Sequence, residues 1–248
     1  IDNNIFDGNV SLKNKFSFRK NLNENYVSLA SSQLNWTNQK IKKNLGLIFD
    51  NEANLRVTSI SIDEKSRSDT SNIRFYPQLS SKISYPLLKS SSSFNQTVTP
   101  IIMPIIAPYN NYTEAQDVTN SNLFSRNRAT SISEWESGPR INYGIEWFIN
   151  SEKGTDIRTV IGQNYRFNKL RDDTSREISD YFINSNININ LENYLDGSLI
   201  IDRDDLKIRS LNANSFNRLG DLIFAINYDY TSGKYNTSAE QMAVGGKY

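Results

Sequence analysis

The stretch Thr97–Phe148 decides the fold of this chain. It reads TVTPIIMPIIAPYNNY at residues 97–112 and NLFSRNRATSISEWESGPRINYGIEWF at residues 122–148. Toward its end, every second residue is apolar: Ile141, Tyr143, Ile145, Trp147 and then Ile149. The residues between them are mostly polar: Asn142, Gly144, Glu146 and Phe148. A period of two is that of a β-strand with one apolar and one polar face, so we expect such a strand here.

A long loop at residues 109–138 is expected between this strand and an apolar strand over residues 94–107. At about thirty residues it far exceeds the usual connection of two to six, and loops of that length are usually functional or disordered. The apolar side chains Leu123, Phe124 and Trp135 favour an ordered loop that packs against the rest of the protein. We expect these three side chains, more than the loop charges, to hold the loop in place.

The composition excludes several classes of site. The chain has 248 residues with no cysteine and no histidine, which removes Cys/His zinc sites, thiol nucleophiles and histidine triads. Lys plus Arg number 28 against 27 Asp plus Glu, without the basic excess of nucleic-acid binders. Hydrophobic residues make up only 37 %, yet aromatic residues reach 11 %, which argues against disorder and suits a protein with a wet interior.

The period of two recurs along the chain and gives about twelve strands with almost no helical pattern. In the clearest case Ile183, Ile187 and Ile189 alternate with Asn186, Asn188 and Asn190, and in a later strand Phe224 and Ile226 share the apolar face. We expect these apolar residues to face lipid and the asparagines to face a lumen.

One strand changes phase. Over residues 45–62 the apolar positions are odd-numbered up to Val57 and then become Ile60 and Ile62. A β-bulge inserts one extra residue and reverses the faces beyond it. We therefore expect a bulge near Thr58.

These patterns predict an all-β fold, an antiparallel transmembrane β-barrel of the outer-membrane type. Short turns near Ser151, Asn193 and Asn217 alternate with longer loops near Asn111 and Asp172, as they do in such barrels. Aromatic side chains near strand ends fit the interfacial girdles of a barrel: Trp36, Trp147, Tyr165 and Tyr230. We expect residues 1–248 to form part of a single barrel domain, with about twelve strands of a larger barrel.

Three prolines make the strand over residues 94–107 unusual. Pro100, Pro104 and Pro108 are spaced four apart, so within a strand their missing N–H groups would all face the same neighbour. Either that seam is loose or the chain bulges there. The alternative is that Pro108, and Pro100 with it, lie just outside the strand.

Two acidic groups have a chemical and a structural interpretation. Glu134 and Glu136 could be paired carboxylates for hydrolysis, but no partner motif accompanies them, and we interpret them as ordinary loop charges. Asp202, Asp204 and Asp205 could bind calcium, and a hairpin turn explains them better. We expect no enzyme activity, no metal and no cofactor.

Several segments together resemble the LptD family, the outer-membrane lipopolysaccharide (LPS) assembly proteins. The similarity covers roughly residues 74–248 and includes the proline-bearing strand, in which Thr99 stands where the family has an acidic residue. A Leu-Phe-x-x-x-Arg run is matched by Leu123, Phe124 and Arg128. A Val-Gly-Gln-x-Tyr strand is matched by Ile161, Gly162, Gln163 and Tyr165.

The resemblance implies a function and partners. It implies the C-terminal barrel of a translocon in the cell outer membrane that inserts LPS into the outer leaflet. The implied partners are LPS, membrane lipids, an LptE-type lipoprotein plug and an LptA-type periplasmic bridge protein, with no nucleic acid. Arg126 and Arg128 would then either tie the loop down, which we favour because the implied exit path is lateral, or meet LPS phosphates.

Two other classes of protein remain open at this point. Another outer-membrane barrel, a porin or a receptor, would share the strand pattern. A porin is expected to fold strongly charged loops into its lumen, and the loop at 109–138 is only mildly charged. A soluble β-sandwich binding module is the third possibility, and it would form two packed sheets.

Overall fold

The computed structural model describes residues 4–5, 7–20, 26–63, 70–109, 122–129, 135–152, 154–167, 177–190, 192–232 and 238–248. Fourteen strands account for most of this part of the chain. They are β1(Asn4–Ile5), β2(Gly8–Lys20), β3(Tyr26–Lys42), β4(Leu47–Asp63), β5(Thr70–Ser84), β6(Leu87–Ser90), β7(Phe94–Ile106), β8(Arg140–Ser151), β9(Asp156–Arg166), β10(Tyr181–Asn190), β11(Asn193–Ile201), β12(Ile208–Leu219), β13(Leu222–Thr231) and β14(Ala239–Lys247). The described residues contain no helix long and apolar enough to cross a membrane.

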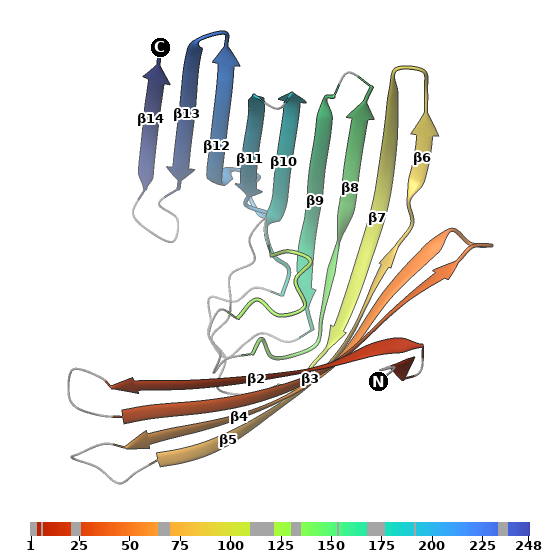
Figure 1. Ribbon diagram of the computed structural model, residues 1–248, viewed down its shortest axis with the longest axis vertical. Coiled ribbons are helices and arrows are strands. Elements are labelled where there is room, and N and C mark those ends of the chain that lie inside the picture. The colour runs from red at the N-terminus through yellow and green to blue at the C-terminus, as the bar shows by residue number, and fades with distance from the viewer. Residues whose placement is uncertain are drawn as a thin grey trace.

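All strands belong to one antiparallel sheet, in which neighbours in sequence pair with each other except that β5 and β6 both pair with β7 (Figure 1). β1 holds two residues, and β6 continues the line of β5 along β7, so twelve long strands remain of the fourteen. The sheet is open, with β1 and β14 at its two edges. One meandering sheet is the topology expected for a section of barrel wall, and it excludes the two packed sheets of a sandwich.

The apolar residues of successive strands meet on one face of the sheet. Ile187 pairs with Leu195, Leu195 with Ser215, and Ser215 with Ile226, so Ile187 and Ile226 share that face. Large apolar side chains on the same face are exposed along the whole sheet, from Phe18 in β2 to Val244 in β14. The predicted all-β sheet with one exposed apolar face is therefore confirmed.

The opposite face is polar and carries rows of amide and carboxylate side chains. One row crosses four strands through Asn186, Asp196, Asn214 and Asn227. Asn186 donates to Asp196 over 2.7 Å, and Asn227 donates to Asn214. These bonds satisfy the polar groups of neighbouring strands with one another, as cross-strand pairs do.

The predicted bulge near Thr58 is wrong. β4 pairs with β3 and with β5 in an unshifted register across this position. Ile60 therefore lies on the polar face, opposite Leu29 of β3, and Ile62 lies opposite Val27. The ladder itself stays regular. The change of apolar phase therefore reflects a small apolar patch at the end of the polar face, formed by Ile60 and Ile62 with Leu29 and Val27.

Short turns and long loops lie at opposite ends of the strands. The turns Lys43–Gly46 and Gly220–Asp221 lie at one end, and Gly46 and Gly220 adopt the positive φ that such tight turns require. The connection from Ile106 to Arg140 and that from Arg166 to Tyr181 lie at the other end. This is the asymmetry that the sequence predicted.

Ile187 and Asn188 provide a test of the two faces, because they are adjacent in β10 and point in opposite directions. In the full protein, we expect Ile187→Arg to lower the unfolding free energy by roughly 2–4 kcal/mol if the residue lies at mid-bilayer. Asn188→Arg should cost much less because its side chain lies on the polar face. Unfolding in lipid vesicles measures both, and equal costs would contradict the assignment of faces.

Candidate functional site

The described residues of the long loop, 122–129 and 135–139, pack against the polar face of the sheet. Figure 1 shows them at the ends of β8 and β9, and their side chains reach β4 and β5. This loop is the candidate functional site, because it brings together buried charges, buried aromatic rings and strands that are distant in sequence.

Beneath the loop, three rows of side chains cross β7, β8 and β9. The first row is Ile101, Gly144 and Gly162, the second is Met103, Asn142 and Asn164, and the third is Ile105, Arg140 and Arg166. Asn164 donates to the Asn142 side chain over 2.5 Å. Each row has an apolar residue on β7. On β8 and β9 the first row continues with glycines, the second with asparagines and the third with arginines, so the three rows offer the loop different contacts.

Leu123 lies over the first row. Its side chain is only 2 % exposed. A Cβ built on Gly162 would lie 2.6 Å from Leu123 Cδ2 and 2.5 Å from the carbonyl oxygen of Tyr143, so only glycine leaves room for this contact. Gly162 therefore leaves the space that the Leu123 side chain of the loop occupies.

Glu136 lies over the third row and is bound by three arginines. Arg128 of the loop donates through Nε to both carboxylate oxygens, at 3.0 and 2.9 Å, and through Nη2 over 2.5 Å. Arg140 Nη2 lies 3.1 Å from Oε2, and Arg166 also pairs with Oε1. We call Arg128, Glu136, Arg140 and Arg166 the arginine–glutamate node.

The node is almost entirely shielded from water, and it holds three cations for one anion. Backbone carbonyls of Arg126, Glu136 and Gly138 accept further bonds from Arg140. Burial alone would raise the pKa of the Glu136 carboxyl, but Arg128, Arg140 and Arg166 together lower it below its usual value of 4.5. The carboxylate is thus the group on which the burial of all three arginines depends.

Arg126 attaches the loop to the other part of the sheet. It lies 3.3 Å from Asp50 and 3.1 Å from Glu52, both on β4, and donates to Ser80 Oγ of β5 over 3.1 Å. Its own backbone carbonyl accepts a 2.9 Å bond from Gln78 of β5. One loop residue therefore contacts two neighbouring strands through both its side chain and its backbone.

Trp135 completes this second attachment. It is 5 % exposed, its ring stacks on Tyr76 of β5 with centroids 6.5 Å apart, and the Arg56 guanidinium of β4 lies 5.4 Å from its centre. Such stacking and cation–π contacts add to the effect of burial. We call Arg126 and Trp135, with their partners on β4 and β5, the aromatic clamp.

Phe124 differs from the other loop anchors because it is only half-buried. Lys82 Nζ lies 5.9 Å from the centre of its ring. Together with Trp135, Gln33, Glu52 and Gln78 it borders a polar hollow of about 490 Å³ on the inner side of the loop. Phe124 thus lines this hollow instead of filling a core.

The structure places two of the three prolines within β7. Pro100 pairs with Ile145 and Pro104 with Ile141 of β8, so both belong to the strand. Pro108 follows the strand, and its carbonyl accepts a 3.0 Å bond from the Gly138 N–H. The loop therefore closes on itself directly beyond β7.

The acidic groups take different roles from those considered on sequence. Glu136 is a buried ion-pair partner, so its interpretation as an ordinary loop charge is wrong; Glu134 lies outside the described residues. Asp202, Asp204 and Asp205 form the turn between β11 and β12, where Asp202 accepts a 2.9 Å bond from the Asp204 N–H. No group of three or more potential metal-binding side chains occurs in the described residues.

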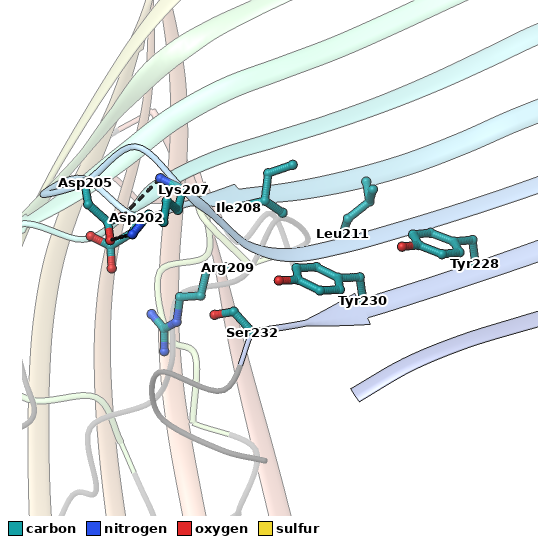
Figure 2. A pocket seen from close by; sticks show the side chains of 9 residues that line it. All are labelled: Asp202, Asp205, Lys207, Ile208, Arg209, Leu211, Tyr228, Tyr230 and Ser232. Atoms are coloured by element: carbon teal, nitrogen blue, oxygen red, sulfur yellow. Dashed lines mark hydrogen bonds and ion pairs between the residues drawn. The ribbon is translucent and has the colours of Figure 1, made fainter. Parts of the chain in front are cut away.

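A second hollow, of about 690 Å³, lies at the ends of β12 and β13 (Figure 2). Leu211, Tyr228 and Tyr230 line it from the apolar face of the sheet. Its two cations are already paired, Lys207 with Asp205 at 3.4 Å and Arg209 with Asp180 at 2.6 Å. The lining of this hollow is therefore mainly aromatic and apolar, and its charged side chains are engaged in ion pairs.

Arg140 and Arg166 were not recognised from the sequence. Both occupy polar-face positions at the loop ends of their strands, and Arg140 pairs directly with Arg166. Two arginines placed side by side require a shared anion, so the strand phase together with the register could have identified them. The register itself was unknown before the structure.

Comparison with known proteins identifies one family. The family model LptD, described as LPS transport system D, matches residues 5–246, nearly the whole chain. No curated protein matches the chain.

The arginine–glutamate node yields the first prediction for this site. Glu136→Gln in the full protein leaves three buried arginines without their anion, and we expect it to cost about 3–5 kcal/mol and to expose the loop to protease. Glu146→Gln is the control, because its partner Arg158 has a side chain that is 58 % exposed and such pairs contribute about 0–1 kcal/mol. Limited proteolysis and thermal unfolding measure the difference, and equal behaviour of the two variants would contradict the role of the node.

The second prediction concerns pH. A lowered carboxyl pKa gives stability that is present above the unfolded-state value and is lost as the pH falls through the folded-state value. The loop should therefore stay protected from hydrogen exchange between about pH 7 and pH 5, and lose this protection only below the Glu136 reference pKa of 4.5. Loss of loop protection already near neutral pH would show that Glu136 is not held as the anion.

Proposed function

Because this chain belongs to the LptD family of LPS transport proteins, we propose that its sheet forms wall of an outer-membrane translocon that inserts LPS into the outer leaflet. The family match over residues 5–246 carries this proposal, since it covers every strand of the sheet except the outermost residues. The family is one of transport and assembly and not of enzymes. The chain is accordingly a conduit in this proposal, with no catalytic residue.

The two faces of the sheet support a place in the outer membrane. The exposed apolar face would contact lipid tails, and the polar face would line an aqueous lumen. Tyr228 and Tyr230, at the rim of the hollow in Figure 2, would lie at the level of the lipid headgroups, where amphipathic rings are favoured.

The loop at 109–138 would be an extracellular cap that folds back into the lumen. It lies on the rim with the longer connections, which in outer-membrane barrels is the external one. The two attachments, the node and the aromatic clamp, would keep the cap against the inner wall. The polar hollow beside Phe124 would then open toward the lumen.

The arginines of the loop serve the cap in this proposal and do not meet the phosphates of LPS. Arg128 is fully shielded by Glu136 and its neighbours, and Arg126 is neutralised by Asp50 and Glu52. A guanidinium that already binds carboxylates has little remaining capacity for a phosphate.

The partners in this proposal are those of the family's transport route. LPS would reach the barrel from an LptA-type periplasmic bridge protein, and an LptE-type lipoprotein would plug the lumen. Membrane lipids would surround the apolar face. The polar face, which is rich in paired asparagines, offers hydrogen-bonding groups for a lumenal protein partner.

Surface LPS in a depletion strain tests the function. The host's own LptD-type protein is depleted, the full protein carrying this chain is supplied, and LPS on the cell surface is quantified with a non-permeating label. Restored surface LPS is the expected result. Restored solute uptake without surface LPS would favour a porin or receptor and overturn the proposal.

Removing the apolar anchors should impair the same function. Each of Leu123→Ala and Trp135→Ala removes a buried large side chain and is expected to cost about 2–5 kcal/mol. We therefore expect the double variant to lose loop protection and to place less LPS on the surface. Phe18→Ala is the control, because Phe18 is 83 % exposed on the apolar face. Normal surface LPS with an unprotected loop would show that the cap is not needed for transport.

A further inference from the structure

The β5–β7 seam is the one long strand pair of the described sheet with gaps in its ladder. Only four residue pairs join the two strands: Leu79 with Ile106, Ser80 with Ile105, Ile83 with Ile102 and Ser84 with Ile101. The same register continues into β6, where Leu87 pairs with Val98. The strands thus stay aligned, while the pairs at Pro104 and Pro100 are missing.

The prolines cause these gaps. In an antiparallel pair, alternate residues direct both their N–H and their C=O toward the same neighbour. The Pro100 carbonyl accepts a 3.1 Å bond from the Tyr85 N–H, so Pro100 directs its backbone groups toward β5. Pro104, four residues later, has the same orientation. Two of the four β7 positions that should donate across this seam, at residues 100, 102, 104 and 106, therefore lack an N–H.

The two sides of the seam also differ in direction. Figure 1 shows β2–β5 running at a steep angle to β7–β14. Elsewhere the long ladders are continuous or carry only a local bulge, as at Asn188–Asn190 and Ile200–Ile201. A change of direction coincides here with a loss of hydrogen bonds.

The loop attaches to both sides of this seam. Its aromatic clamp contacts β4 and β5 through Arg126 and Trp135. Its node and the Leu123 contact hold β8 and β9, through Arg140, Arg166 and Gly162. The described loop residues therefore bridge the seam on the polar face and replace contacts that the backbone ladder lacks.

We propose that the β5–β7 seam is a hinge line in the wall and that residues 122–129 and 135–139 form a clasp across it. With the clasp in place, the wall is closed. When the clamp side releases, the seam separates between β5 and β7 while the ladders on either side stay intact. This device does not depend on which molecule the protein transports.

Hydrogen exchange of backbone amides in the full protein, in membrane vesicles, tests the hinge. The amides of Ile83, Tyr85, Ile102 and Ile106 face the seam, and we expect them to exchange on the order of tenfold faster than the paired amides of β8 and β9. Arg126→Ala with Trp135→Ala should accelerate the seam amides by a further factor on the order of ten and leave the β8–β9 amides unchanged. Arg158→Ala, which removes an exposed ion pair from β9, is the control and should change neither set.

Two further variants act in the opposite direction. Pro104→Ile returns a donor to the seam and should slow exchange there. Ser84→Cys with Ile101→Cys places two cysteines opposite each other across the seam, and a disulfide between them should protect the seam even without the clamp. The control disulfide joins β9 and β10 through Thr159→Cys with Ser185→Cys, at positions where the two native hydroxyls lie 2.9 Å apart. This control should not protect the seam.

Three results would overturn the proposal. Seam amides that exchange no faster than those of β8–β9 would show that the prolines leave no hinge. Equal acceleration of all ladders in the clamp variant would show a general loss of stability instead of release at one seam. If the β9–β10 disulfide protected the seam amides as well as the seam disulfide does, the position of the crosslink would be irrelevant.

Discussion

Backbone hydrogen bonding between neighbouring strands is the constraint on which this structure depends. A strand in lipid has no water to satisfy its N–H and C=O groups, so each must pair with the next strand. The chain meets this requirement with a sequential antiparallel sheet, and the strict alternation of side chains follows from it. The same constraint makes a proline in the wall costly, because its neighbour keeps an acceptor without a donor. Pro100 and Pro104 are therefore exceptions that need a structural explanation.

The described residues of the loop, 122–129 and 135–139, supply that explanation through side-chain contacts. They lie on the polar face and bind strands on both sides of the weakened ladder. Electrostatic attachment is effective here because the loop excludes water from the node, and a buried ion pair depends strongly on each of its members. In the hinge that we propose, such side-chain contacts stand in for part of the backbone bonding at the β5–β7 seam.

Much of the fold could be predicted from the sequence, because a period of two is visible in the residues themselves. The alternation in Ile183–Asn190 and the apolar face that includes Ile226 were predictable in this way. The bulge near Thr58 was predicted wrongly, since Ile60 and Ile62 lie on the polar face opposite Leu29 and Val27, an apolar patch that periodicity alone cannot distinguish from a shift of register. The node could not be predicted, because it depends on the pairing of Arg140 with Arg166 and on a loop residue placed above both.

The composition of the polar face explains why charged and apolar side chains of the loop both contribute to its attachment. Large apolar partners on that face are concentrated in β7, at Ile101, Met103 and Ile105, and the neighbouring positions on β8 and β9 are glycine, asparagine or arginine. Beyond this strip, β5 offers the loop the buried ring of Tyr76, and the other partners on β4 and β5 are polar or charged. To reach β4 and β5 the loop must pair with Asp50, Glu52 and Arg56, as Arg126 and Trp135 do. The charges of the proposed clasp thus match the polar face on which it lies.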